Sequence, residues 1–116
     1  IINNKVRILY FCEKEDLCVV KQRVGEIFNK LIPLMNTGID MDFIHITDTF
    51  NDWQQMLLMS LCDHNIIANS SYSWWGAYFN KNPLKIVAYP PIWFGPLLIN
   101  NKIQDLCPKT WHKIKL

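Results

Sequence analysis

The stretch from Asn65 to Asn80 constrains the fold more than any other part of the sequence, because its composition changes twice within one short window. The apolar run Ile66–Ala68 is too short and too β-branched for a helix and is typical of a buried strand. From Ser73 onward, apolar side chains recur at helical spacing. The polar residues between these segments therefore lie at a strand-to-helix turn. Such a turn offers backbone N–H groups and hydroxyl donors, and it predicts a site for a phosphate or diphosphate.

Residues 58–78 read LMSLCDHNIIANSSYSWWGAY. This segment closely resembles the signature of the α-1,2-fucosyltransferases, which are family 11 glycosyltransferases. A looser resemblance extends from Val6 to Trp111 and corresponds to the C-terminal half of that family. A run of this length with two tryptophans is far more specific than a lone glycine-rich loop. The resemblance implies the nucleotide-sugar-binding half of a glycosyltransferase.

Length and composition predict one packed domain over residues 1–116. Half of the 116 residues are hydrophobic and 13% are aromatic, which is typical of a globular chain rather than a disordered one. The formal net charge is +2 and the lysines are scattered, so nucleic-acid binding is not expected. No apolar run approaches the roughly 20 residues that a membrane span needs. The sequence begins at Ile1 without a methionine, which suggests a segment of a longer glycosyltransferase.

The cysteines and a glycosylation motif bear on the compartment. The chain has no Cys-x-x-Cys pair and no Cys/His metal pattern, so we expect reduced core cysteines. Asn69-Ser70-Ser71 is a glycosylation acceptor motif, but it falls in the turn expected to close around a ligand, where a glycan is not expected. These features favour a cytoplasmic location, with a membrane-associated or Golgi setting as the alternative. The cysteines are Cys12, Cys18, Cys62 and Cys107.

The first half of the chain predicts a strand, a helix and a second strand. Val6–Cys12 is almost continuously apolar and predicts a strand buried on both faces. Apolar residues from Val20 to Leu31 recur at helical spacing and predict a helix that ends before Pro33. A turn signal at Asn36–Gly38 then leads into a strand at Phe43–Ile46. This order predicts a right-handed parallel crossover.

The second half continues the alternation. Asn51 can cap a helix at Trp53–Cys62, with Gln54 as its reciprocal partner, and the apolar residues of this helix cover more than one face, so we expect it to be buried all round. The pattern predicts an α/β fold with a Rossmann-like parallel sheet flanked by helices, and the resemblance implies the C-terminal lobe of a two-lobed, GT-B-type glycosyltransferase. The remaining expected elements are strands at 65–68 and 85–88, helices at 74–79 and 103–107, and an amphipathic end with Trp111.

The resemblance assigns roles in donor binding to the turn. Related fucosyltransferases hold the nucleotide diphosphate with a serine or threonine pair after this strand and with the aromatic residue that follows. The structural alternative is a serine-rich helix N-cap without a ligand. Where the family usually has an acidic residue thought to face guanine, this chain has an amide, which suits the paired N–H donors of guanine less well. The expected donor-binding residues are Asn69, Ser70, Ser71, Tyr72, Ser73 and Gln55.

Several other residues are interpreted as structural. Asp40-Met41-Asp42 has the Asp-x-Asp form of metal-dependent glycosyltransferases, but helix dipole and hydroxyl donors can neutralise a diphosphate, so neither a metal nor a cofactor is expected. The isolated histidines are expected to be structural. The aromatic residues after the turn are expected to pack in the core. These two groups are His45, His64 and His112, and Trp74, Trp75, Tyr78 and Phe79.

No catalytic residue is assigned. The family's arginine motif, which is thought to stabilise the departing diphosphate, belongs to its N-terminal half, and this chain has only Arg7 and Arg23. The first strand runs into an acidic segment in which Glu13 or Glu15 stands in for a Ser-Asp-type ending. We therefore expect this chain alone to lack the full catalytic apparatus.

The resemblance predicts the GDP-fucose-binding part of an inverting, metal-independent enzyme that moves L-fucose to a galactose-type hydroxyl. A missing N-terminal lobe would hold the oligosaccharide acceptor. The alternative is a degenerate, non-catalytic domain that binds carbohydrate or a partner chain, which Gln55 and the absent arginine motif favour. A generic nucleotide-binding domain is disfavoured because the chain has no glycine-rich fingerprint.

Overall fold

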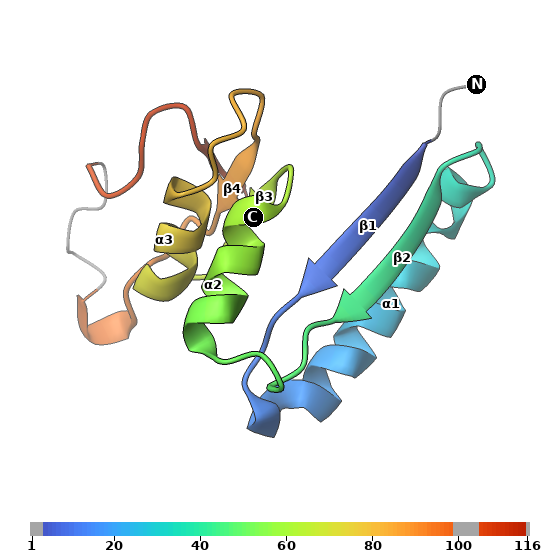
Figure 1. The fold of residues 1–116 in the computed structure, drawn as a ribbon, viewed down its shortest axis with the longest axis horizontal. Helices are drawn as coiled ribbons and strands as arrows, with labels where there is room; N and C mark the ends of the chain where they lie inside the picture. Colours follow the sequence, from blue (N-terminus) through green and yellow to red (C-terminus); the bar gives the residue numbers. More distant parts are fainter. Residues whose placement is uncertain (1–3, 99–104, 116) are drawn as a thin grey trace. The chain divides into compact units, whose positions relative to one another are not determined.

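The computed structural model describes residues 4–98 and 105–115. The chain divides into two compact units, of which the first ends at Asn51 and the second begins at Asp52. Each unit contains parallel strands and helices, as the labelled elements in Figure 1 show. The predicted α/β class, with parallel strands flanked by helices, is confirmed. The single domain over residues 1–116 stays a prediction.

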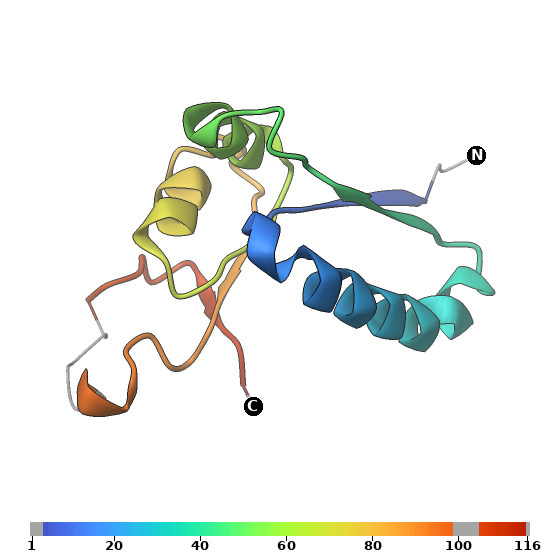
Figure 2. The same ribbon diagram turned by 90° about the horizontal axis from the view of Figure 1, so that it is seen from below.

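The first unit is a strand–helix–strand motif. β1 (Lys5–Tyr10) pairs in parallel with β2 (Asp40–His45), in a register that runs from Lys5 opposite Asp40 to Tyr10 opposite His45. α1 (Leu17–Met35) follows a short 3₁₀ turn and lies along one face of this pair (Figure 2). The ring of Phe28 on α1 meets the ring of Phe43 on β2 edge-on, with centroids 6.1 Å apart. The predicted parallel crossover connection is therefore present.

α1 does not end before Pro33, as the sequence predicted, but continues to Met35. A proline this close to the end of a helix removes only one backbone donor, so the final turn still forms. The helix ends where the Asn36 N–H bonds to the Ile32 carbonyl and Gly38 takes a φ of 102°. That left-handed conformation is one that glycine adopts without steric cost, so the predicted turn signal was correct and the predicted proline stop was wrong.

The two strands also differ from their predicted form. The first three residues of β1 are exposed and the last three are half-buried, so the prediction of a strand buried on both faces is wrong. The physical reason is that, within residues 4–51, the structure describes two strands and one α-helix along them. β2 begins at Asp40, earlier than predicted, because the whole segment pairs with β1.

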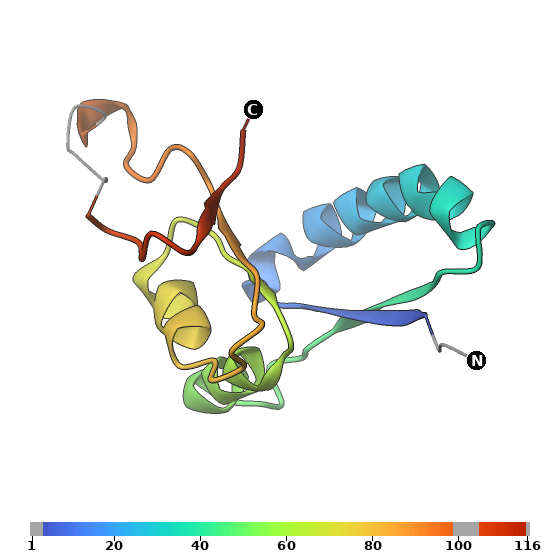
Figure 3. The same ribbon diagram turned by 90° about the horizontal axis from the view of Figure 1, so that it is seen from above.

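The second unit contains the sheet whose first strand leads into the predicted serine turn. Its three strands are parallel and are ordered β3-β4-β5, and Figure 3 shows β4 and β5 side by side. The core consists of the buried residues Ile67, Ala77, Val87 and Trp111, each at most 7% exposed. Two helices accompany the sheet. The elements are α2 (Asp52–Leu61), β3 (Asn65–Ile66), α3 (Ser71–Tyr78), β4 (Val87–Tyr89) and β5 (His112–Lys113).

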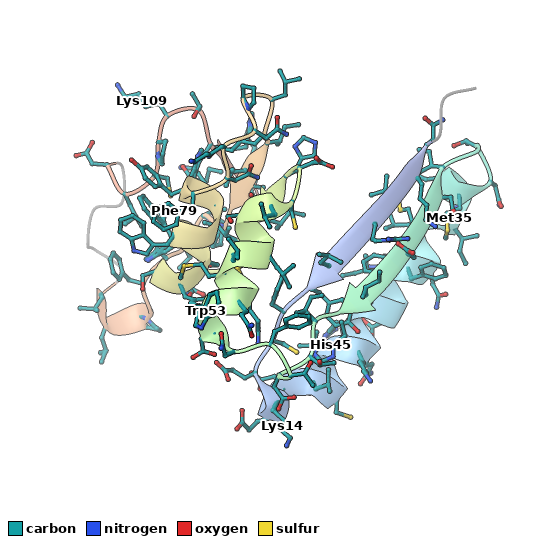
Figure 4. All side chains as sticks on the ribbon, in the orientation of Figure 1. Lys14, Met35, His45, Trp53, Phe79 and Lys109 are labelled. Carbon is teal, nitrogen blue, oxygen red and sulfur yellow. The ribbon has the colours of Figure 1, made fainter. Side chains whose placement is uncertain are left out.

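α2 is buried along one side only, so the prediction that it is buried all round is wrong. Met59 faces Gly76 of α3, whereas Trp53, Leu57 and Leu61 on another face are 64%, 50% and 72% exposed. Trp53 is labelled at the first turn of α2 in Figure 4. This helix carries more apolar side chains than the single face that packs against α3 can bury.

The C-terminal region differs most from the sequence-based expectation. Trp111 is buried and is followed by β5, where the sequence predicted only an amphipathic end. The predicted helix at 103–107 lies partly outside the described residues, and Asp105–Cys107 form a turn. Among residues 4–98 and 105–115, no helix has both the length and the apolar content needed to cross a membrane.

Candidate functional site

The turn between β3 and α3 has the predicted strand-to-helix form. The chain stays paired with β4 through a 2.9 Å bond from the Ile67 N–H to the Ala88 carbonyl. Ser70 then takes an extended conformation, with φ −140° and ψ 130°, and its hydroxyl accepts a 3.4 Å hydrogen bond from the Ser73 N–H. Its carbonyl accepts from the Trp74 N–H at 3.0 Å. Ser70 is therefore the N-cap, and α3 begins at Ser71 rather than at Trp74.

The three serine hydroxyls of the turn have different environments. The Ser70 hydroxyl caps the helix, and the Ser73 hydroxyl donates to the Ser70 carbonyl at 3.1 Å and to the Ala68 carbonyl at 3.3 Å. The Ser71 side chain is exposed in the first turn of α3. First-turn N–H groups have no acceptor within their own helix, so Ser71 combines an exposed hydroxyl with the positive end of the helix.

Tyr72 connects the turn to α2. Its hydroxyl donates a short hydrogen bond to the Asp52 carbonyl at the first residue of α2. The N-terminal ends of α2 and α3 therefore lie together. Gln55, less than one turn further along α2, is half-buried near the same end. The structure thus brings the region of Gln55 close to the serine turn, although the two are well separated in sequence.

Asn69 connects the turn to the segment that follows β4. Its side-chain amide donates a 3.0 Å hydrogen bond to the Trp93 carbonyl. Because β3 and β4 are parallel, both connections leave the sheet at the same edge, where open α/β sheets bind their ligands. The structure therefore places all six predicted donor-binding residues in the second unit, five of them in one turn.

A polar network, which the sequence analysis missed, lies after the C-terminal end of α3. Asn80 is 4% exposed, and its side-chain amide donates to the Cys62 carbonyl and to Asn65 Oδ1, both at 2.8 Å. Lys85 Nζ donates to the carbonyls of Ala77 and Asn80, at 2.9 and 2.7 Å. A cation at this position complements the helix dipole. The Asn82-Pro83 turn signal could have indicated a tight connection here, but not its partners.

The histidines and aromatic residues follow the predictions only in part. His64 Nδ1 accepts a 2.9 Å bond from the Ile86 N–H, so its predicted structural role is confirmed. Trp74 packs against the core and donates its indole N–H to the Leu106 carbonyl at 3.0 Å, which confirms core packing for that residue. The core prediction is wrong for the other three aromatic residues of α3, because this short helix turns Gly76 and Ala77 inward. These residues are Trp75, Tyr78 and Phe79, which are 44%, 52% and 52% exposed.

The acidic pair of the first unit lies inside β2. Asp42 forms an ion pair with Arg7 on β1 at 3.5 Å; the Arg7 side chain is exposed, whereas Asp42 is half-buried. Within the ranges that the structure describes, no three His, Cys, Asp or Glu side chains come together as a metal site requires. The metal-independent interpretation stays a prediction.

The cysteines are free thiols in different environments. Burial raises the pKa of the Cys12, Cys62 and Cys107 thiols, and nearby carboxylates raise it further for Cys12 and Cys62. Cys12 also contacts His45 Nε2 at 3.9 Å. Cys18 is exposed on α1, so the prediction that it lies in the core is wrong.

Comparisons with known proteins agree with the predicted family. The model of glycosyl transferase family 11 matches residues 36–114. An alpha-1,2-colitosyltransferase of Escherichia coli is 33% identical over 108 residues, which are 93% of this chain and 33% of that relative. The O-antigen biosynthesis glycosyltransferase WbnK of Escherichia coli is 57% identical over 56 residues, which are 48% of this chain and 17% of that relative. The chain thus spans about a third or less of these relatives. No solved structure matches it.

Proposed function

This chain belongs to glycosyltransferase family 11, and from that premise we propose that it supplies the donor-nucleotide site of an enzyme that transfers L-fucose from GDP-fucose to a galactose-type hydroxyl. The observation that carries the proposal is the exposed Ser71 in the first turn of α3, just beyond β3 and within the segment that matches the family. First-turn N–H groups and a hydroxyl are suitable donors to a diphosphate.

The residues of the turn would have different roles in donor binding. Ser71 would donate to the diphosphate, and the helix dipole would offset part of its charge without a metal ion. The Ser73 hydroxyl donates within the turn and the Ser70 oxygen accepts the Ser73 N–H, so these two hydroxyls would mainly hold the shape of the turn. The Tyr72 hydroxyl is occupied by the Asp52 carbonyl, so the ring would be the part of Tyr72 that faces the nucleotide.

In the transfer reaction, the acceptor hydroxyl would attack the anomeric carbon with inversion while GDP leaves. Negative charge grows on the diphosphate as the glycosidic bond breaks, so donors that are already oriented toward it lower the barrier. That is the part of the reaction to which this chain would contribute. The oligosaccharide acceptor and the activation of its hydroxyl would depend on other parts of the native protein.

A second candidate concerns the donated sugar. The relative that aligns with 93% of this chain is an alpha-1,2-colitosyltransferase, so a colitosyl donor is the alternative to GDP-fucose. The nucleotide site would serve either donor, because the serine turn would contact the diphosphate, which the two donors would share, and not the sugar. The two candidates therefore share the nucleotide test and differ only in the product.

Calorimetric titration of the chain with GDP, ADP and UDP tests the nucleotide site. We expect GDP to bind most tightly, and we expect the affinity to be unchanged when a chelator is added. Equal affinity for the three nucleotides would retain the phosphate site but remove the guanine assignment, for which Gln55 would be the physical reason. The absence of binding by any of them would overturn the proposal.

Product analysis with the native protein tests the transferred sugar. The protein is incubated with a galactose-terminated acceptor and with either GDP-fucose or a colitosyl donor, and the product is identified by mass and linkage. Product from GDP-fucose alone supports the first candidate, and product from the colitosyl donor alone supports the second. GDP binding without transfer from either donor would favour the non-catalytic alternative.

A further inference from the structure

We propose that the segment Pro90–Gly95 forms a second wall of the nucleotide site and that Asn69 is the positioning residue that holds this wall in place. The proposal rests on the proposed function, since it names a further contact surface for the same nucleotide. The sequence analysis included Asn69 among the donor-binding residues but assigned no role to the segment after β4. The structure connects the two by a hydrogen bond.

The sheet brings both segments to one edge. β3 and β4 are parallel, with Asn65 opposite Val87 and Ile66 opposite Ala88, and the Ile67 N–H continues the pairing to the Ala88 carbonyl. The chain therefore leaves both strands in the same direction. After β3 it enters the serine turn, and after β4 it enters Pro90–Gly95. A ligand seated on the serine turn beyond this edge is flanked by the second segment.

Two contacts fix the second segment. The Trp93 side chain packs against the core, and the Trp93 carbonyl accepts the 3.0 Å bond from the Asn69 amide. Pro90 and Pro91, which open the segment, restrict its backbone further. Ile92, next to the anchored residue, is 58% exposed and gives this segment an apolar surface. This wall would therefore be ordered before a donor nucleotide binds.

The amide hydrogen of Asn69 that is donated to the Trp93 carbonyl is not available to a ligand. Its Nδ2 is engaged with Trp93, which lies 24 positions away in the sequence. Replacing Asn69 by alanine would release the Trp93 carbonyl while leaving the Ser70 cap and the exposed Ser71 unchanged. The change should therefore loosen the wall without removing the phosphate donors of the turn.

Hydrogen exchange of the backbone amides, measured by mass spectrometry with and without GDP, tests the proposal. In the unmodified chain we expect GDP to slow exchange at residues 71–72, in the turn, and at residues 92–95, in the wall. In Asn69→Ala we expect exchange at residues 92–95 to be about two- to tenfold faster without ligand, as the loss of one hydrogen bond implies.

Asn82→Ala is the matched control. Asn82 also donates its side-chain amide to a backbone carbonyl, that of Asp63, at 3.0 Å, but it lies at the opposite end of the strands. The Asn82→Ala substitution should leave hydrogen exchange at residues 92–95 unchanged. Protection of residues 71–72 but not 92–95 in the unmodified chain would overturn this inference alone, as would unchanged exchange at 92–95 in Asn69→Ala. Absence of GDP protection in both segments would overturn the proposed function as well.

Discussion

Gly76 on α3 lies so close to Met59 on α2 that a Cβ at position 76 would stand 2.9 Å from Met59 Cβ and 3.0 Å from its sulfur. A rotamer change can move the sulfur but not the Cβ, so the two helix backbones would have to separate. This contact lies near the C-terminal ends of α2 and α3, whereas the hydrogen bond from the Tyr72 hydroxyl to the Asp52 carbonyl joins their N-terminal ends. The close approach at Gly76 and the bond at Tyr72 together hold α2 and α3 side by side.

Gly76→Ala is expected to destabilise the chain by about 1–3 kcal/mol, because overpacking forces a backbone shift. Gly25→Ala on α1 is the matched control, since no atom lies within 4 Å of the added methyl group and the position is exposed. This control should instead stabilise α1 by about 0.4–1 kcal/mol. Urea unfolding of both variants provides the comparison. A loss of stability in Gly25→Ala equal to that in Gly76→Ala would contradict the packing argument.

Single replacements of Ser70 and Ser71 should have opposite effects on stability and binding. Ser70→Ala removes the N-cap acceptor of the Ser73 N–H and should cost about 0.5–2 kcal/mol of unfolding free energy. Ser71→Ala should change stability by less than about 0.5 kcal/mol, because its side chain is exposed. It should weaken GDP binding about tenfold or more, through loss of a hydrogen bond to a charged group. Thermal unfolding and GDP titration are measured on the same samples.

The outcome of the Ser71 experiment decides the donor assignment. If Ser71→Ala binds GDP as strongly as the unmodified chain, the exposed hydroxyl is not a diphosphate donor. If Ser70→Ala alone weakens GDP binding while stability is unchanged, the N-cap role of Ser70 is wrong and its hydroxyl serves the ligand.

Asn80→Ala is expected to cost about 2–3 kcal/mol. The change leaves the partly buried carbonyl of Cys62 without the Asn80 amide, and Asn65 Oδ1 and the Asn82 N–H lose their bonds to this side chain. Asn29→Ala, at an exposed position of α1, should change stability by no more than about 0.5 kcal/mol. Chemical denaturation of the two variants gives the difference. Equal, small effects would show that the network contributes little net stability.

Lys85→Met should destabilise the second unit by about 1.5–3 kcal/mol, because two charge-assisted hydrogen bonds to the carbonyls of Ala77 and Asn80 are lost while the apolar stem is retained. Lys81→Met removes the same charge from an exposed position of the adjacent turn and serves as control. The measurement is the midpoint of thermal unfolding for each variant. Similar midpoints for both would mean that Lys85 acts only through net charge.

Thiol alkylation should distinguish the cysteines. Burial raises the pKa of Cys12, Cys62 and Cys107, so at a given pH each carries less thiolate than an ordinary cysteine and should react more slowly with iodoacetamide. Their rates should continue to rise at pH values above the usual cysteine range. Cys18 is exposed and should be modified first. Peptide mass spectrometry across a pH series measures each site, and preferential modification of Cys62 at neutral pH would contradict this order.

The sequence determined the features that depend on neighbouring residues. The β-branched run at Ile66 and Ile67, the serines after it and the helical spacing from Ser73 specified the strand, the turn and the helix, because strand propensity and N-capping act over a few positions. The same local run carried the family resemblance that the comparison with glycosyl transferase family 11 confirms. Even here the helix began three residues earlier than predicted, at Ser71, because the Ser70 hydroxyl is the cap.

Only the tertiary structure decided which distant groups meet. Asn69 reaches the Trp93 carbonyl, Tyr72 reaches Asp52, and the chain after Trp111 adds a third parallel strand. None of these contacts follows from local propensity, because each depends on the order of the strands and on which face of each helix the sheet covers. The tertiary structure also decided which apolar side chains are buried. An apolar helix face stays exposed to water unless another element packs against it, and Trp53 and Leu57 on α2 are examples of such exposed side chains.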